Sequence, residues 1–349
     1  MDFAIRKQSF LEAPDYWCTR LTDIEALAPQ LERAEHVVIG HSAGGRPIHC
    51  FAYGEREEVR GTATFSSAIA SGNPKSFFDP AWRRKPVILI VEPVHGQEGE
   101  GVAGCLNLLS ILERGSDLRG RAWPRIAQLA TGFRTVVVPL MNPDGRERIP
   151  IDNLRGSDID DVHYYGQGVT KEGQILTWPD VKQWNPIPRE MVSLLGAYYN
   201  DAGVDLYHDD FILSPQPETT ALLSLAGQEL PDVALSLHAC GHAPVFVGAQ
   251  AILSPPYQAR ADHLEAVCLH RLRQEGYPIP APYLAPERWF SQETALFIVS
   301  GCVSVLLELP HGMTLWPFTF DQIIDIWLLA VEELMAFGQG FGLRPQQVL

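Results

Sequence analysis

Two histidines and two glutamates in this sequence have the residue types of a metal-dependent active site. His95 and Glu98 stand three positions apart in the segment HGQEG, directly after an apolar run. His238 and Glu308 each lie near the end of another apolar run. Imidazole nitrogens and carboxylate oxygens bind zinc, and two histidines with one glutamate leave a coordination position open, which is typical of catalytic zinc. The pattern predicts a catalytic metal centre, with one carboxylate left over to move a proton.

Strands must bring these residues together, because they come from distant parts of the chain. Three apolar runs precede or contain them, at 86–94, 232–239 and 300–310. Runs rich in Val, Ile and Leu are typical of strands covered on both faces of an α/β sheet. Ligands of open α/β sheets bind at the carboxyl ends of the strands. We therefore expect the two imidazoles and two carboxylates to meet at one edge of a sheet.

Strands and helices alternate along the chain, which predicts one α/β domain with a mixed, mostly parallel sheet flanked by helices. We take residues 1–349 as this single domain, with residues 1–35 as an N-terminal extension and 340–349 as a C-terminal tail. The stretch 146–185 is polar and rich in Gly and Pro, which indicates a long functional loop. Further strands are expected at 36–40, 47–54 and 135–140, and helices at 102–115, 187–201, 255–276 and 321–338.

Composition excludes some classes of function. Of 349 residues, 46% are hydrophobic, enough for a sizeable core, and the net charge of -15 argues against a nucleic-acid partner. The N-terminal residues lack the apolar region of a signal peptide, and no run is long and apolar enough for a membrane span. Six scattered cysteines form no C-x-x-C motif. We expect a cytoplasmic protein that does not bind membranes, and its oligomeric state stays open.

The segments around these residues resemble the zinc carboxypeptidase (metallocarboxypeptidase) family. IGHSAGGRPI at 39–48 is similar to an early strand–turn–strand signature of that family. The order of the later motifs also fits: HGQE at 95–98, NPDG at 142–145, GVD at 203–205, SLH at 236–238 and VLLELPHG at 305–312. The resemblance covers roughly positions 39 to 312, and it implies the fold of that family and hydrolysis of a peptide or peptide-like amide.

The resemblance also implies individual roles. His95, Glu98 and His238 would bind one Zn²⁺, and Glu308 would be the general base that accepts a proton from the water held there. Asp205, in the GVD motif, would accept a hydrogen bond from a ligand histidine, which fixes the imidazole tautomer. An arginine after NPDG would polarise the substrate carbonyl. Arg155 fits that distance best, with Arg146 and Arg148 as competitors.

The sequence departs from the family where a substrate carboxylate would bind. Members of the family usually carry Asn-Arg soon after GVD, whereas this chain has Tyr207-His208-Asp209-Asp210. A neutral imidazole does not replace the five donors of a guanidinium group. The expected substrate is a peptide or small amide of open identity. The residues expected to contact it are Asn142, Tyr207, His208, Tyr283 and Arg288.

Two other functions compete with metal-dependent hydrolysis. Gly40-His41-Ser42-Ala43-Gly44 matches the G-x-S-x-G motif of serine hydrolases, with Ser42 as the nucleophile. That motif requires a helix directly after it, whereas GRPIHCFAY indicates a strand. The second alternative is a non-catalytic zinc-binding or interaction module of the same fold. An acid at Glu308 in so apolar a run favours catalysis over that alternative, because burial of a carboxylate is unfavourable unless it is paired or functional.

Overall fold

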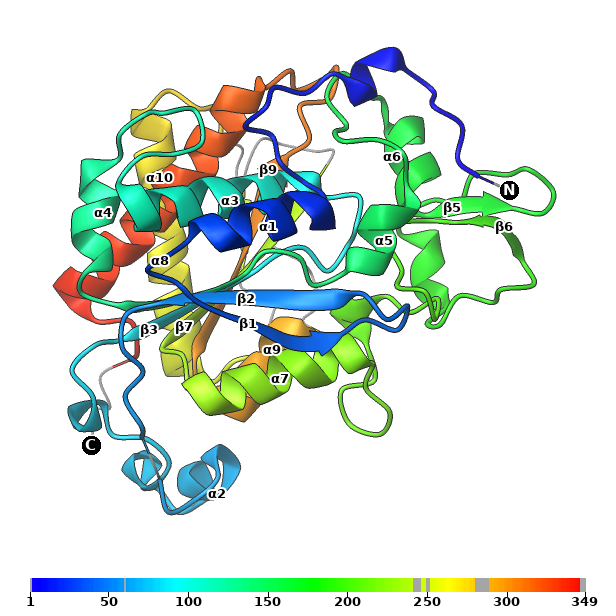
Figure 1. Ribbon diagram of the computed structural model, residues 1–349. Coiled ribbons are helices and arrows are strands. Elements are labelled where there is room, and N and C mark those ends of the chain that lie inside the picture. The colour runs from blue at the N-terminus through cyan, green and yellow to red at the C-terminus, as the bar shows by residue number, and fades with distance from the viewer. Residues whose placement is uncertain (1, 60, 241–245, 249–251, 280–288, 346–349) are drawn as a thin grey trace.

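A seven-stranded sheet runs through the centre of the molecule in the computed structural model (Figure 1). The structure describes residues 2–59, 61–240, 246–248, 252–279 and 289–345. The strands lie in the order β1-β2-β4-β3-β7-β9-β8. Their bounds are β1 Glu35–His41, β2 Pro47–Tyr53, β3 Val87–Val91, β4 Arg134–Val138, β7 Val233–Cys240, β8 Phe246–Gly248 and β9 Val303–Pro310.

The four central strands are parallel and the outer ones are antiparallel. β3 pairs in parallel with β4 and β7, and β7 pairs in parallel with β9. β1, β2 and β8 add antiparallel pairs at the two sides. The central strands are buried along their length because Val, Ile and Leu fill both faces, as expected for strands covered by helices on both sides. The predicted mixed, mostly parallel sheet flanked by helices is confirmed.

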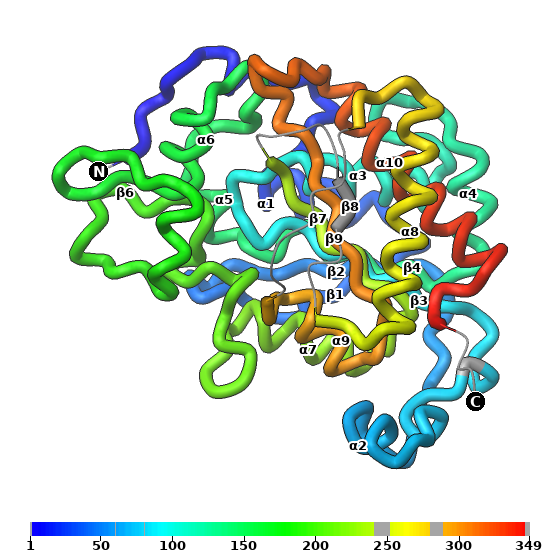
Figure 2. Tube along the Cα trace, turned by 180° about the vertical axis from the view of Figure 1, so that it is seen from behind, coloured from blue at the N-terminus to red at the C-terminus, as the bar shows by residue number. Residues whose placement is uncertain are grey.

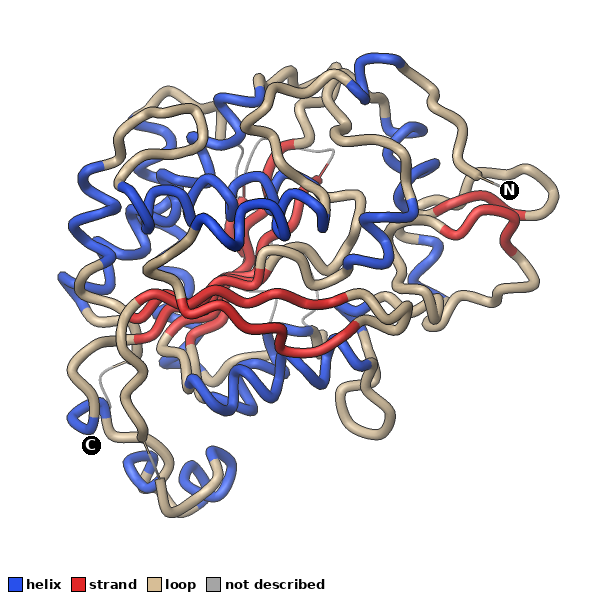
Figure 3. Tube along the Cα trace, in the orientation of Figure 1, coloured by secondary structure: helices blue, strands red, loops and turns tan. Residues whose placement is uncertain are grey.

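Helices cover both faces of this sheet, and Figure 3 shows the strands between them. One face packs against the larger core cluster, which includes Leu106, Leu269 and Trp327. The helices there are α1 Leu21–Leu27, α3 Gly99–Arg114, α4 Pro124–Ala130, α8 Pro255–Gln274 and α10 Phe320–Phe341. The other face packs against α7 Pro217–Glu229 and α9 Gln292–Ser300 through Leu222, Leu225 and Leu296. Seen from behind, α8 and α10 lie side by side, and α9 and α7 lie beneath the sheet (Figure 2).

A smaller lobe beside the sheet joins the N-terminus to the segment after NPDG. Phe3 and Phe10 pack there against Tyr165. The lobe contains α5 Pro143–Arg148, α6 Ile159–Gly166 and the two-stranded sheet of β5 Gly168–Thr170 and β6 Val192–Leu195. The short helix α2, Phe65–Ala70, lies away from this lobe, at the bottom of the view in Figure 1.

Two expectations for this lobe were wrong. The helix expected at 187–201 is absent, and Val192–Leu195 instead pairs with β5. Apolar residues in a short segment fit either period, and here pairing between strands outweighs helix propensity. The expected long loop at 146–185 also contains α6 and β5. The other predicted strands and helices are present, with shifted ends, and the elements that were not predicted include α1, α2, α4, α5, α7, α9 and β8.

Candidate metal centre

Three strand ends at the carboxyl edge of the sheet supply the candidate metal ligands. His95 follows β3 in a tight turn, in which the backbone N–H of Glu98 donates to the carbonyl oxygen of His95 at 3.1 Å. Glu98 is the residue before α3. His238 lies within β7, directly opposite Glu308 of β9 in the parallel register. The sequence therefore brings the four residues to one edge because each sits where a central parallel strand ends.

The donor atoms of three of these residues converge. The Nδ1 atoms of His95 and His238 lie 3.2 Å apart. Glu98 places one carboxylate oxygen 2.9 Å from Nδ1 of His95 and the other 3.4 Å from Nδ1 of His238. Within the described residues, this is the one group of at least three His, Cys, Asp or Glu whose donor atoms come this close. All three residues are buried, each 4–5% exposed.

The chemistry of this donor set fits zinc. Nε2 of His95 lies 3.2 Å from the carboxylate of Asp205, and this acceptor places the imidazole proton on Nε2. Nδ1 can then present its lone pair to a metal ion that the Glu98 carboxylate also binds. Two ligand atoms on a tetrahedral zinc ion are roughly 3.3 Å apart, since Zn–N bonds are about 2.0–2.1 Å. The observed separations of 2.9–3.4 Å match this requirement.

Electrostatic interactions at this site keep Glu98 ionised. Burial alone would raise the pKa of the Glu98 carboxyl, but the attraction of His95 and His238 outweighs burial and lowers the pKa well below its usual value. Burial would likewise lower the pKa of His95, whereas Glu98 and Asp205 together raise it. The site is therefore built around negative charge that attracts a cation.

Glu308 has the properties expected of a proton acceptor beside this group. Burial raises the pKa of its carboxyl to about 7; attraction from His238 opposes the shift and repulsion from Glu98 adds to it. One of its carboxylate oxygens is buried and has no hydrogen-bond partner within the described residues. A carboxyl group with a pKa near neutrality can accept and release a proton at physiological pH.

Tyr207 and His208 lie beside the metal group, and their role in substrate binding stays a prediction. The Tyr207 ring is 4.9 Å from the ring of His238, and the Tyr207 hydroxyl is buried toward Glu293. Burial, together with the positive charge of Lys182, lowers the pKa of His208 to about 4, so this imidazole is neutral at pH 7. Where the resemblance implies an arginine, His208 therefore supplies a neutral imidazole.

The arginines after NPDG are engaged elsewhere. Arg155 donates from Nε to the carbonyl oxygen of Phe318 at 2.8 Å, and its guanidinium lies 4.4 Å over the ring of Phe320. Arg146 is buried and donates to the carbonyl oxygens of Gly96 and Ile151. None of these contacts reaches the metal group. The role of Arg155 as the group that polarises the carbonyl stays a prediction.

The remaining substrate-contact predictions are of two kinds. Asn142 is fully buried, and its amide donates to the carbonyl oxygen of Val94 and accepts from the N–H of Gly145. These bonds hold α5 against the end of β3, so the amide belongs to the framework under the site. Tyr283 and Arg288 lie outside the described residues.

Three further residues complete the site, and the sequence analysis missed them. The ring of Tyr198 stacks on His95 at a centroid distance of 3.8 Å, and Lys182 forms an ion pair with Asp205 at 2.8 Å. Glu92, directly after β3, is fully buried, and its carboxyl interacts electrostatically with Glu98. Only Glu92 had a signal in the sequence, as an acid within the apolar run 86–94.

Ser42 does not form a nucleophile elbow. It lies in the tight turn between β1 and β2, it is 4% exposed, and its hydroxyl donates to the Asp144 carboxylate at 2.5 Å. No helix follows it, and its hydroxyl bonds to no histidine, so the geometry does not support the serine hydrolase alternative.

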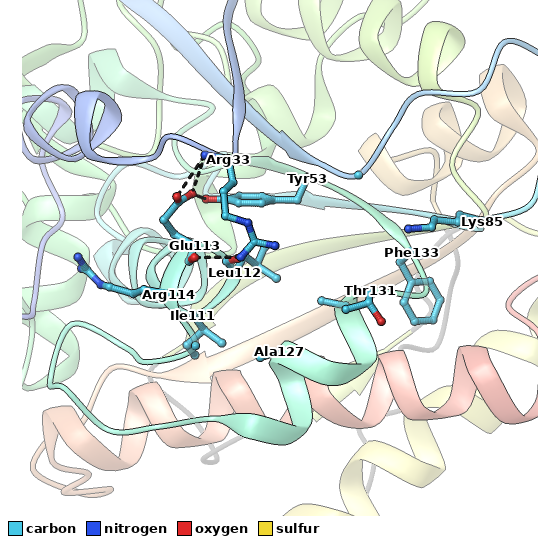
Figure 4. Close-up of a pocket in the computed structure, with 13 residues that line it drawn as sticks. Arg33, Tyr53, Lys85, Ile111, Leu112, Glu113, Arg114, Ala127, Thr131 and Phe133 are labelled. Carbon is cyan, nitrogen blue, oxygen red and sulfur yellow. Dashed lines mark hydrogen bonds between the residues drawn. The ribbon is translucent and has the colours of Figure 1, made fainter.

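A cavity of about 560 Å³ lies away from the metal group, at the opposite edge of the sheet (Figure 4). Arg33, Glu113 and Phe133 are among the residues that line it. Two of its charged groups bond to the protein itself: Glu113 accepts from the Tyr53 hydroxyl at 3.0 Å, and Arg33 donates to the carbonyl oxygen of Leu112 at 2.9 Å. This cavity therefore contains neither metal ligands nor an activated nucleophile.

The fold and the donor set together resemble those of metallocarboxypeptidases. The sequence model of the zinc carboxypeptidase family matches residues 21–171, which include His95 and Glu98. The resemblance to that family is confirmed. A comparison with the curated proteins found no significant match.

Solved structures extend the likeness to nearly the whole chain. A metallo-carboxypeptidase from Burkholderia cenocepacia aligns with a TM-score of 0.56 at 15% identity, covering 92% of this chain and 69% of that one. Carboxypeptidase A from Helicoverpa armigera aligns with a TM-score of 0.54 at 14% identity, covering 93% and 74%. A Pseudomonas aeruginosa metallo-carboxypeptidase, solved with (2-guanidinoethylmercapto)succinic acid, gives 0.52 at 16% identity, covering 93% and 70%. At these identities the likeness establishes the fold.

Proposed function

We propose that this protein is a zinc-dependent hydrolase of a peptide or peptide-like amide bond. The observation that carries the proposal is the convergence of both Nδ1 atoms and the Glu98 carboxylate within 3.4 Å, beside the carboxyl group of Glu308. His95, Glu98 and His238 would hold the zinc ion. When bound, zinc supplies a Lewis acid that polarises a carbonyl oxygen and lowers the pKa of water toward about 7.

The side chains of this protein divide the remaining work. Glu308 accepts a proton from the attacking water on its unpartnered oxygen and later returns the proton to the leaving amine. Asp205 accepts from Nε2 of His95 and so keeps Nδ1 free for the metal ion. Tyr198 covers the face of the His95 ring and limits its rotation. Arg155 would need to move from Phe318 to polarise the substrate carbonyl.

The part of the site where a substrate carboxylate would bind differs from that of a carboxypeptidase with Asn-Arg. His208 is neutral at pH 7 and Tyr207 is uncharged, so neither binds a terminal carboxylate through a full positive charge. We therefore propose amides with uncharged ends as substrates. A screen of peptides with a free C-terminus, an amidated C-terminus and a γ-glutamyl bond tests this assignment. Strong preference for the free α-carboxylate would contradict it.

The decisive test of the reaction is Glu308→Gln. The variant is expected to bind zinc stoichiometrically and to lose turnover by about 10²–10⁴-fold, the usual contribution of a general base. Glu172→Gln, at an exposed position, is the matched control and should keep full activity. Full activity in zinc-free protein would refute metal-dependent hydrolysis. Tight zinc binding without turnover of any amide would instead support the non-catalytic zinc-binding module.

A further inference from the structure

Lys182 contacts both groups that hold the His95 imidazole in place. Its ammonium group lies 2.8 Å from Oδ2 of Asp205, whose Oδ1 is 3.2 Å from Nε2 of His95. The same ammonium group lies 4.9 Å over the ring of Tyr198, which stacks on His95 with an interplanar angle of 11°. Lys182 therefore touches the partner at the edge of the imidazole and the partner on its face.

The segment that carries Lys182 is itself fixed to Asp205. Lys182 lies in the short helix η5, Asp180–Gln183. Two residues later, the Asn185 side chain accepts from the backbone N–H of Asp205 at 2.9 Å and donates to its carbonyl oxygen at 3.1 Å. These two bonds hold the lysine stem at a constant distance from the carboxylate. The ion pair between Lys182 and Asp205 is thus supported by backbone contacts of the segment that carries Lys182, and it does not depend on the side-chain conformation of Lys182 alone.

The Asp205 carboxylate depends on this lysine. Its side chain is 4% exposed, whereas that of Lys182 is 28% exposed. A buried carboxylate is unfavourable unless it is paired and hydrogen-bonded. Oδ1 accepts from the backbone N–H of Tyr207 at 3.0 Å in addition to its contact with His95, and Lys182 is the cation at Oδ2. Removal of the ammonium group would leave Oδ2 without a charged partner and let the carboxylate turn.

We propose that Lys182 is a positioning residue of the metal centre, which holds Asp205 and Tyr198 in the places where they orient His95. The inference rests on the proposed zinc site. Lys182 does not touch the metal ligands directly, so its effect on zinc passes through Asp205 and Tyr198. Partners of this outer kind typically account for 10- to 100-fold in metal affinity.

Zinc affinity and the spectrum of the cobalt-substituted protein test this proposal. Lys182→Met keeps most of the apolar stem and removes the charge. We expect zinc affinity, measured by competition with a chromophoric chelator, to fall about tenfold. The visible absorption bands of bound Co²⁺ should shift because they report ligand geometry. Lys182→Arg should recover most of the affinity. Lys171→Met, at an exposed position in the same lobe, is the matched control and should change neither readout.

A double variant tests the route through Asp205. In an Asp205→Asn background, Lys182→Met should add little further loss, because the carboxylate that it holds is gone. Additive losses, an unchanged affinity and spectrum, or tighter zinc binding in Lys182→Met would each overturn the proposal. If Lys182→Met does not fold, Lys182→Leu supplies a second neutral variant, with circular dichroism as the check. Wild-type protein that binds no zinc would refute the proposed zinc site itself, an outcome separate from those for Lys182.

Discussion

Both edges of the central sheet, at the amino ends and at the carboxyl ends of its parallel strands, contain buried charged groups. The two edges differ in how these groups are partnered. At the amino edge, Arg134 and Glu229 form two parallel bonds of 2.8 and 3.0 Å. Nearby, Asp232 accepts from Arg83, from Arg344 and from the backbone N–H of Val87. Arg134, Glu229 and Asp232 each have a partner of opposite charge, so these pairs stabilise the fold.

At the carboxyl edge, by contrast, several buried polar atoms lack a hydrogen-bond partner. One oxygen of Glu98, one oxygen of Glu308, Nε2 of His238 and both oxygens of Glu92 are buried without a hydrogen-bond partner in the described part of the chain. Buried polar atoms are almost always partnered in folded proteins, so a cluster of exceptions needs an explanation. A bound cation and a reacting water would provide partners for the oxygens of Glu98 and Glu308. Both edges are buried, so burial does not distinguish them. They differ in whether the buried polar atoms have hydrogen-bond partners: those of the structural cluster at the amino edge do, and several at the metal site do not.

The largest expected effect is the loss of zinc from His238→Ala. Four-ligand zinc sites bind with about 10–16 kcal/mol, so removal of one ligand should cost roughly 4 kcal/mol, close to 1000-fold in affinity. Chelator competition measures this loss. The control is His263→Ala, an exposed histidine on α8. Unchanged zinc affinity would mean that the unpartnered atoms at the carboxyl edge serve something other than a metal ion.

Much of this edge was predictable from the sequence, because His95, Glu98, His238 and Glu308 all follow or end strands whose apolar runs are unmistakable. The spacing of a parallel sheet then brings strand ends together without any knowledge of side-chain geometry. Lys182 was not predictable. It lies in a polar segment between elements, and only the folded chain places it beside Asp205.

The smaller lobe shows the limit of period-based prediction. Met191 to Tyr199 contains apolar residues compatible with either a helix or a strand. Pairing of Val192–Leu195 with β5 decides in favour of the strand, and that partner is itself only three residues long, Gly168–Thr170. A strand this short carries too few residues to show alternation, so tertiary contacts rather than local pattern determine this region.

At the amino edge, Glu229→Ala should lower the free energy of unfolding and leave the metal site intact. The substitution leaves Arg134 buried without its main partner, and such broken pairs cost about 3 kcal/mol. Urea unfolding measures this change, and zinc affinity should stay at the wild-type value. Arg134→Met with Glu229→Leu removes both charges and should recover most of the stability. A drop in zinc affinity in Glu229→Ala would break the separation between the two edges.

The pH dependence of stability tests whether the buried Glu92 carboxyl, at the carboxyl edge, is charged in the folded protein. Burial raises the pKa of its carboxyl well above the usual value, so the folded protein keeps the proton while the unfolded chain loses it above about pH 4.5. The folded state then binds more protons, and the contribution of Glu92 to stability falls as pH rises, by at most about 1.4 kcal/mol per unit. Glu92→Gln lacks this dependence.

Urea unfolding of wild type and Glu92→Gln at pH 5, 6 and 7 measures the difference. The variant should match the wild type most closely at pH 5 and gain on it as pH rises. Glu172→Gln, whose side chain is exposed, should show no such trend. Parallel curves for wild type and Glu92→Gln would show that Glu92 is ionised in the folded state and has a cationic partner.

The smallest expected effect is that of Ser42→Ala. This substitution tests a carboxylate near the carboxyl edge, that of Asp144, whose hydrogen bonds are all made within the protein. Asp144, in the first turn of α5, accepts from Ser42, from the backbone N–H of Gly44 and from Arg46, at 2.5–2.8 Å, and also from the backbone N–H of Asp201. Loss of the hydroxyl removes one of four donors, so the free energy of unfolding should fall by about 1 kcal/mol.

Turnover and zinc affinity should remain at wild-type values in Ser42→Ala. Asp144 already accepts from four donors, so it takes no part in metal binding, and the Ser42 hydroxyl has no histidine partner to activate it in the described part of the chain. The same assays applied to Glu308→Gln should give the opposite result, lost turnover with no decrease in the free energy of unfolding, because burial of the ionised Glu308 carboxylate is unfavourable. Abolished activity in Ser42→Ala, with zinc still bound, would move the reaction to the turn between β1 and β2. It would also show that an unpartnered oxygen is a poor guide to the reactive group in this fold.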